Sequence, residues 1–140
     1  MHNNLTDSRP TVIDQRGRTV ILPERVSRIL TLQPILTQLV WRLAPHKLLN
    51  VDRLFKARLS SFPCPKEDLN LLSSLPVVGV YFDPPDQEQV IALKPDLVAT
   101  MAGDPNLEAY PEICNCPAIA ANKTNLSDCA VTIRMLGQVV

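Results

Sequence analysis

Long apolar segments and aromatic side chains are both scarce in this sequence. Aromatic residues make up 4% of the 140 residues, and no stretch approaches the ~18 consecutive apolar residues that a membrane span needs. The N-terminus also lacks the basic and then apolar pattern of a secretory signal. We therefore expect a soluble chain. If a signal has been removed, a periplasmic or extracellular, membrane-associated location is also open.

An excess of either charge is absent as well, because 14 basic residues balance 14 acidic ones. This balance argues against nucleic acid as the main partner, since such proteins depend on a basic surface. The length and the 46% hydrophobic content predict one domain with a single core. With 13 prolines and 4 glycines, we expect stiff connections between short elements.

Catalytic signatures are missing from the sequence too. It has no Walker loop, no G-x-G-x-x-G after a strand and no G-x-S-x-G elbow. Asp83, Asp86 and Glu88 lie in a proline-rich loop and a helix start, where capping is a simpler use than acid–base chemistry. We predict that the protein is not an enzyme and has no resident cofactor.

The cysteines match no standard disulfide or metal framework. Cys114 and Cys116 have no second pair and no nearby histidine, so they form a poor closed zinc site. We expect these two thiols, together with Cys64 and Cys129, to be structural or incidental. One disulfide is the alternative if the protein is exported, and a metal or redox role for the Cys-x-Cys pair is the least favoured.

The most informative stretch is LPVVGVYFDPPDQEQVIALKPDLVAT, residues 75–100. The β-branched run at 77–80 is typical of a doubly buried strand. Asp86 can cap a helix that ends before Pro95, because the residue preceding proline avoids helical geometry. A second strand is expected at 97–100, which completes a strand–helix–strand unit.

The same alternation of strands and helices continues along the rest of the chain. The patterns predict a hairpin of 11–14 and 19–22 around Gly17, strands at 28–32, 48–51 and 118–121, helices at 35–43, 66–72 and 106–113, and a last helix capped by Ser127-Asp128 with Val131, Ile133, Leu136 and Val139 as its apolar residues. Trp41 is expected to pack in the core. The fold class is α/β, a Rossmann-like three-layer lobe with a mostly parallel sheet, an N-terminal β-hairpin and a C-terminal helix.

The order of these motifs resembles a known family. The matching pieces are Val12-Ile13-Asp14 with Gly17 and Val20, Leu22-Pro23, Arg28-Ile29 with Leu32 and Pro34, Leu75 to Gly79, Glu88 to Val98, and Asp128 to Gly137. Together they resemble the N-terminal lobe of the substrate-binding proteins of ABC importers for iron-siderophores, haem and vitamin B12. Members of that family hold their ligand in a cleft between two lobes that one long helix connects.

The resemblance implies how the chain is divided. Residues 1–10 would be a flexible segment, 11–125 the N-terminal lobe, and 126–140 the start of the connecting helix. A second lobe is absent from the sequence. The chain would then be a domain of a longer protein or a natural one-lobed relative. The latter would need a partner chain, such as a second copy in a homodimer.

The resemblance also implies a ligand-binding edge. The residues that follow predicted strands converge on one edge of the sheet and would line the cleft: Gln33, Pro34, Asp52, Arg53, Leu54, Phe55, Tyr81, Phe82, Met101, Ala102 and Gly103. Arg53 is the candidate partner of an anionic siderophore or propionate, and Tyr81 could be an axial iron ligand to haem. The alternative for Phe55 and Phe82 is that they cover the core.

Glu88 matches the family's exposed glutamate, which docks on arginines of the membrane permease. The alternative is an acid in the first helical turn that only stabilises the helix dipole. The function implied is therefore non-catalytic capture of a metal chelate (iron-siderophore, haem or cobalamin) and its delivery to the permease. The alternative function is a one-lobed interaction module, homodimeric or not, that has lost transport.

Overall fold

A parallel sheet forms the centre of the computed structural model, which describes residues 9–61, 63–79, 85–122 and 126–140. The sheet order is β3-β4-β5, in which β3 is Ile29–Thr31, β4 is Leu97–Met101 and β5 is Ala118–Ala121. The strands predicted at 97–100 and 118–121 are present as expected. Both faces of the sheet are covered by helices, as a parallel sheet requires.

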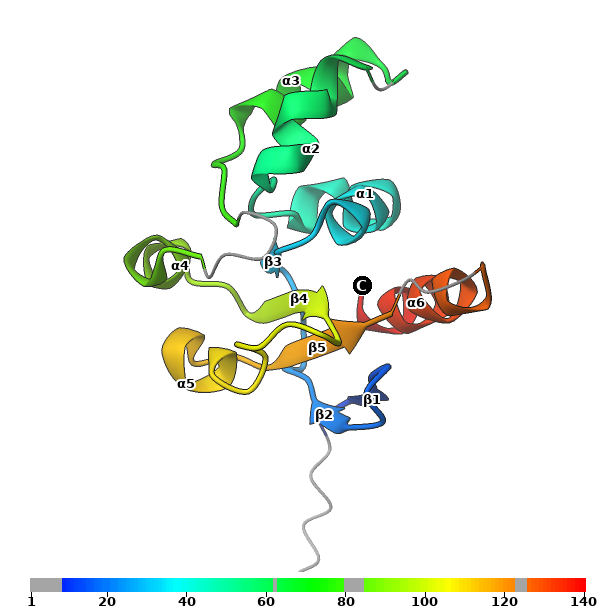
Figure 1. Cartoon of the computed structure of the whole chain (residues 1–140), viewed down its shortest axis with the longest axis vertical. Helices are drawn as coiled ribbons and strands as arrows, with labels where there is room; N and C mark the ends of the chain where they lie inside the picture. Colours follow the sequence, from blue (N-terminus) through cyan, green and yellow to red (C-terminus); the bar gives the residue numbers. More distant parts are fainter. Residues whose placement is uncertain (1–8, 62, 80–84, 123–125) are drawn as a thin grey trace, which may run out of the picture.

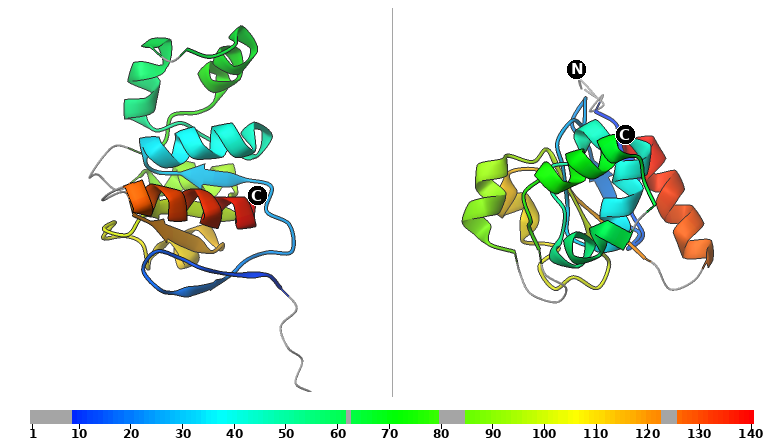
Figure 2. Two further views of the ribbon diagram at one scale, coloured as in Figure 1. Left: turned by 90° about the vertical axis from the view of Figure 1, so that its right-hand side faces the viewer. Right: turned by 90° about the horizontal axis from the view of Figure 1, so that it is seen from above.

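The covering helices lie in pairs on opposite faces (Figure 1). On one face are α1 (Pro34–Leu43) and α6 (Leu126–Val139), and on the other are α4 (Gln87–Leu93) and α5 (Tyr110–Cys114). Further along from α1 lie α2 (Arg53–Arg58) and α3 (Lys66–Ser74), with the short 3-10 turns η1 (Pro45–Lys47) and η2 (Leu59–Ser61). Figure 2 shows α2 and α3 at the opposite end of the molecule from the N-terminal hairpin. The α/β fold class predicted from the sequence is confirmed.

Two further segments extend the sheet beyond β3 as isolated parallel bridges. Leu48 pairs with Ile29, and Val51 pairs with Val77. The predicted strands at 48–51 and 77–80 are therefore wrong as continuous strands within the described residues. Gly79 has a φ of +90°, which turns the chain out of the extended conformation, and Val77 is 38% exposed rather than doubly buried.

The N-terminal hairpin consists of β1 (Thr11–Ile13) and β2 (Thr19–Ile21), with Val12 opposite Val20. Gly17 takes the positive φ that the sequence predicted, at +77°. The turn of the hairpin also closes the free edge of β5, because its backbone and side chains bond to the backbone of that strand. Exposed sheet edges otherwise invite pairing with other chains.

The core lies on both faces of the sheet. Beneath α1 and α6, Trp41 is 2% exposed and its ring packs against Phe55 in a T-shaped pair with a 6.4 Å centroid distance. This confirms Trp41 as a core residue. On the other face, Val90 and Tyr110 pack against Leu30 and its neighbours in the sheet. The core thus consists of two clusters of apolar side chains, one on each face of the sheet. Alternate residues of β3 and β4 contribute to one cluster and then the other, since strand side chains point to opposite faces.

Several helix boundaries differ from the sequence prediction. The α2 helix was not predicted, and α5 begins at Tyr110 rather than at residue 106. The α6 helix begins at Leu126, so Ser127 and Asp128 lie in its first turn instead of capping it. The predicted helices at 35–43, 66–72 and 87–93 are confirmed.

The apolar face predicted for α6 is only half correct. Leu136 and Val139 are buried, whereas Val131 and Ile133 are 46% and 45% exposed. Thr132 takes the buried position instead, where its hydroxyl bonds to the side chain of Gln15 and to two backbone carbonyls. A polar contact between the hairpin and the helix therefore determines which side of α6 faces the core.

None of the described helices is long and apolar enough to cross a membrane. The four cysteines are free thiols. The predicted flexible segment 1–10 lies outside the described residues except for its last two positions. Division of the chain into 11–125 and 126–140 stays a prediction.

Candidate functional site

The candidate site is the edge of the sheet at which its parallel strands end. Gln33 follows β3, Asp52 follows the segment that bridges to β3, and Met101 ends β4. Leu48 pairs with Ile29 in a parallel bridge, and Gln33 and Asp52 each follow four residues after one member of that pair. Ligands of parallel α/β sheets bind outside this edge.

Asp52 is the most unusual residue at this edge. Its side chain caps α2, since Oδ2 accepts from the backbone N–H groups of Leu54 at 3.1 Å and Phe55 at 3.4 Å. Its other oxygen, Oδ1, is buried and has no hydrogen-bond partner in the described part of the chain. Burial raises the pKa of Asp52, and the two capping hydrogen bonds oppose that rise, as does the nearby Thr37 hydroxyl, whose hydrogen bonds in this structure are to Thr31 and the Gln33 carbonyl.

Gln33 presents a second acceptor of the same kind. It precedes α1 without capping it through its side chain, and its Oε1 is buried without a partner among the described residues. The backbone carbonyl of Gln33 is satisfied, because it accepts from the N–H and the hydroxyl of Thr37 at 3.0 and 3.2 Å. Within the described part of the chain, the edge therefore holds two buried side-chain acceptors without donors.

A closed polar network lies directly behind these acceptors. The Asn50 Oδ1 accepts from the Thr31 N–H at 2.8 Å, and Asn50 Nδ2 donates to the Thr31 carbonyl at 2.7 Å and the Val78 carbonyl at 3.2 Å. The Thr31 and Thr37 hydroxyls share a hydrogen bond of 2.7 Å. This network fixes the loops that carry Gln33 and Asp52, because buried polar groups with complete partners are rigid.

The other predicted cleft residues differ in how much surface they offer. Arg53 and Gly103 are exposed, Leu54 is 37% exposed, and Pro34, Met101 and Ala102 are half-buried. Phe55 is 1% exposed and packs on Trp41, as the alternative reading of this residue expected, so it offers a ligand almost no surface. Tyr81 and Phe82 lie outside the described residues, and their roles stay predictions.

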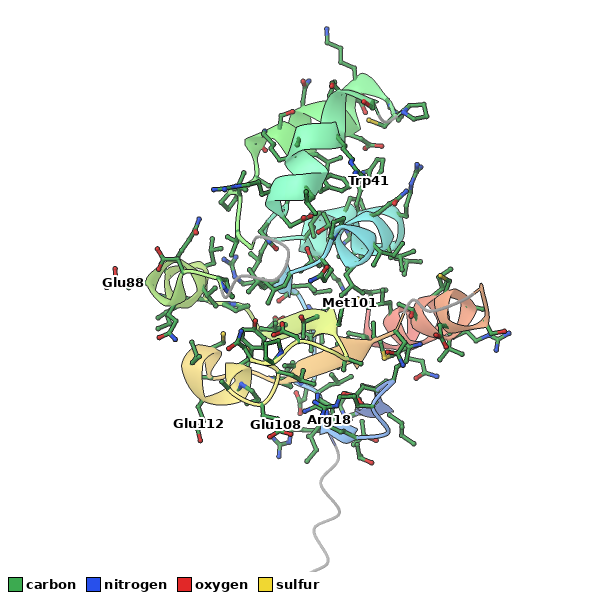
Figure 3. All side chains as sticks on the ribbon, in the orientation of Figure 1. Arg18, Trp41, Glu88, Met101, Glu108 and Glu112 are labelled. Atoms are coloured by element: carbon green, nitrogen blue, oxygen red, sulfur yellow. The ribbon has the colours of Figure 1, made fainter. Side chains whose placement is uncertain are left out.

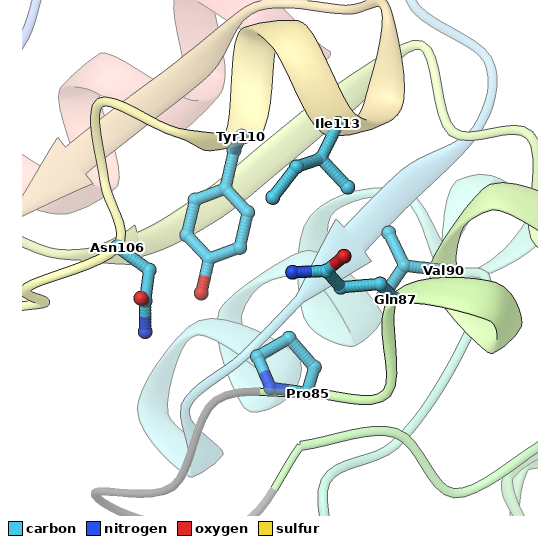
Figure 4. A pocket seen from close by; sticks show the side chains of 6 residues that line it. All are labelled: Pro85, Gln87, Val90, Asn106, Tyr110 and Ile113. Atoms are coloured by element: carbon cyan, nitrogen blue, oxygen red, sulfur yellow. The ribbon is translucent and has the colours of Figure 1, made fainter.

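A small open hollow of about 280 Å³ lies between α4 and α5 (Figure 4). Six side chains line it: Pro85, Gln87, Val90, Asn106, Tyr110 and Ile113. That volume includes open solvent, and the enclosed part has room for about one water molecule, so the hollow does not enclose a ligand. Sequence reasoning missed these residues, although Pro85 and Asn106 also lie in segments that follow strand positions.

Tyr110 and Asp104 hold one wall of this hollow in place. The Tyr110 hydroxyl donates to Asp104 Oδ2 at 3.0 Å, and the Thr100 hydroxyl donates to the same oxygen. Burial, and then the negative charge of Asp104, raise the pKa of Tyr110. The phenol is therefore a neutral hydrogen-bond donor across the physiological pH range.

Glu88 is exposed on the outer side of α4 (Figure 3). Its backbone N–H donates to the capping Asp86 Oδ1 at 3.0 Å, so the helix start is satisfied without the Glu88 carboxylate. No hydrogen bond or ion pair joins that carboxylate to another described residue. Permease docking stays a prediction for this residue.

Among the described residues, no group of three or more His, Cys, Asp or Glu side chains could hold a metal ion.

No protein-family model and no curated protein sequence matches this chain. Solved structures do match it. A periplasmic solute-binding protein from Veillonella parvula is 25% identical, with a TM-score of 0.79 over 93% of this chain and 40% of its own length. The TroA-like periplasmic binding protein FepB from the same organism is 23% identical, with a TM-score of 0.69 over 92% of this chain and 42% of its own.

The fold is that of the TroA-like periplasmic solute-binding proteins. The catecholate-siderophore binding protein VctP from Vibrio cholerae shares it at 17% identity, with a TM-score of 0.66 over 94% of this chain and 45% of its own. The resemblance found in the sequence is thus confirmed at the level of the fold. The chain spans about two fifths of the length of these TroA-like proteins.

Proposed function

We propose that this chain is the N-terminal lobe of a periplasmic, non-catalytic solute-binding protein that captures a metal chelate and delivers it to an ABC importer permease. The observation that carries the proposal is the pair of buried acceptors, Gln33 Oε1 and Asp52 Oδ1, at the ligand-binding edge of the sheet. Leaving a buried acceptor unpaired costs about 1–3 kcal/mol. Both atoms are covered by neighbouring side chains in this structure, so a ligand would recover that free energy by displacing those side chains and bringing donors to both atoms.

The two acceptors favour a ligand with N–H or O–H groups on its periphery. Iron-siderophores and cobalamin carry amide N–H groups that could donate to Gln33 and Asp52, whereas haem offers mainly its carboxylates. Arg53, exposed beside Asp52, would pair with an anionic group of the ligand. The chelates proposed are therefore an iron-siderophore first, then cobalamin, then haem.

The similar structures support this class of ligand without identifying it. VctP is a catecholate-siderophore binding protein with the same fold. We propose that α6 begins the link to a second lobe, which would supply the opposite wall of the cleft, and that Glu88 contacts the permease. In the alternative, a second copy of this chain would supply that wall.

Titration of the chain with ferric catecholate and hydroxamate siderophores, cobalamin and haem tests the proposal. Trp41 is a suitable fluorescent reporter, since it packs on Phe55 at the start of α2, whose cap is Asp52. We expect saturable quenching by at least one chelate. Absorbance of the chelate gives an independent measurement.

A matched pair of variants sharpens the test. Gln33→Leu should weaken binding by about tenfold, because it removes one acceptor from the proposed contact. Gln138→Leu makes the same change at an exposed position of α6 and should leave affinity unchanged. If folded protein binds none of these ligands and elutes as a dimer, the interaction module becomes the better interpretation.

A further inference from the structure

Two cysteines lie next to each other where α5 joins β5. Cys114 is the last residue of α5, and Cys116 lies two residues before the first residue of β5. Asn115 between them is left-handed, with a φ of 52° and a ψ of 41°. This turn brings the two Cα atoms closer than the ~7 Å of an extended pair. Disulfides require Cα separations of about 4.4–6.8 Å.

The two thiols are neighbours on one turn and differ in character. The adjacent Cys116 thiol lowers the pKa of Cys114. The interaction with Cys114, and then burial, raise the pKa of Cys116. Cys116 is 8% exposed, while Cys114 is half-buried and reachable from solvent. Cys114 is therefore the thiol that would attack an external disulfide, and Cys116 is the thiol that would resolve the resulting mixed disulfide.

The other two cysteines are too far away to compete. Cys64 packs against the core cluster beneath α1 and α6, whereas Cys114 and Cys116 belong to the cluster on the other face of the sheet. Cys129 lies on α6. No third His, Cys, Asp or Glu joins the pair among the described residues, so a closed metal site is not formed there.

We propose that Cys114 and Cys116 are a redox modification site, a dithiol that a low-molecular-weight disulfide oxidises to an intramolecular disulfide across the α5–β5 junction. The Cys114 thiolate attacks one sulfur of the small disulfide, forms a mixed disulfide and expels a thiolate that takes up a proton. Cys116 then loses its proton and attacks the Cys114 sulfur, which releases the second small thiol. The dithiol loses two hydrogens and the small disulfide gains them. The inference does not rest on ligand binding or transport.

The test uses oxidised glutathione and a Cys64→Ser/Cys129→Ser double variant, which keeps only the two thiols in question. We expect a product lighter than the reduced protein by the mass of two hydrogen atoms, with the 114–116 peptide joined internally. A stable glutathione adduct on Cys114 in this background, or no reaction, would overturn the proposal. In the four-cysteine protein, a disulfide that includes Cys64 or Cys129 would do the same.

Single variants separate the two roles. With Cys116→Ser, the reaction should stop at a glutathione adduct on Cys114. With Cys114→Ser, Cys116 should react at least about tenfold more slowly, because it is buried and its thiolate is disfavoured. Equal rates for the two variants would contradict the assignment. If either variant fails to fold, as judged by circular dichroism, alkylation of the double variant under native conditions serves instead, and Cys114 should be modified first.

Discussion

The hairpin edge and the ligand edge of the sheet use buried polar side chains in opposite ways. At the hairpin edge, both oxygens of Asp14 are satisfied: Oδ1 accepts from the N–H groups of Arg16 and Arg18, and Oδ2 accepts from the Arg18 guanidinium and the Ala120 N–H. At the candidate ligand edge, Gln33 and Asp52 each keep a buried acceptor without a donor among the described residues. Completed contacts stabilise the fold, whereas incomplete ones call for a separate explanation, for which we propose a bound ligand.

The strongest way to break this comparison is to disrupt the hairpin edge with Asp14→Ala. The change leaves the turn N–H groups, the Ala120 N–H and the Arg18 guanidinium without their acceptor. We expect the free energy of unfolding in urea to fall by about 3 kcal/mol, at the lower end for a buried ion pair because the Arg18 side chain is 30% exposed. Chelate affinity of the remaining folded protein should stay unchanged.

The control for this variant is Glu24→Ala, which removes an exposed acid between β2 and β3. Its effect on unfolding should stay within about 0.5 kcal/mol. A similar loss from both variants would show that net charge, rather than the contacts of Asp14, stabilises the hairpin edge.

At the candidate ligand edge, Asp52→Asn should change the free energy of unfolding by less than Asp14→Ala does, and should raise it instead of lowering it. Asparagine caps a helix as well as aspartate does, and it carries no charge to bury. The pKa of Asp52 is raised from its ordinary 3.8, so the folded state keeps the proton to higher pH than the unfolded chain. The stability from this protonation is complete below pH 3.8 and is lost as pH rises through the raised pKa.

Urea unfolding at several pH values tests this expectation. At pH 7, Asp52→Asn should be more stable than the unmodified protein, and the difference should vanish as the pH falls towards 3.8. Asp52→Ala is the matched variant. This variant loses the helix cap as well as the charge. The lost cap lowers the free energy of unfolding by about 1 kcal/mol at every pH. A pH-independent gain for Asp52→Asn would contradict the proposed burial of charge.

Local patterns were enough to predict much of the fold. The hairpin around Gly17, the strands at 97–100 and 118–121, and the helix capped by Asp86 follow from turn residues, apolar runs and caps within a few residues of one another. The α2 helix has such a signal too, because Asp52 caps it, but these residues were interpreted as a loop at the sheet edge.

Features that depend on distant contacts could not be predicted from the sequence. Thr132 is buried in place of Val131 because its hydroxyl meets Gln15, more than a hundred residues earlier in the chain. The parallel bridge between Ile29 and Leu48, which precedes Gln33 and Asp52 along the chain, is another such contact. Convergence of the candidate residues on one edge stays a prediction. Which described atoms lack donors could not be predicted, since that depends on the packing around each atom.

The smallest expected change in stability comes from Glu88→Ala. This variant tests whether the outer surface of α4 contributes to stability, to ligand binding or to permease binding. Glu88 is exposed in the first turn of α4, so its removal should lower the free energy of unfolding by only about 0.5 kcal/mol through the helix dipole. Chelate affinity should not change. Binding to the importer permease in nanodiscs, with the complete substrate-binding protein carrying the change, should weaken by about tenfold.

Glu112→Ala is the matched control for this last prediction. Glu112 is also an exposed acid in the first turn of a helix, α5, and it lies on the neighbouring element (Figure 3). It should therefore show the same small change in stability and no loss of permease binding. Equal losses from both variants would mean that the permease senses the overall negative charge of this surface. A loss of chelate affinity from Glu88→Ala alone would instead place Glu88 in the ligand site and remove the support for a docking role.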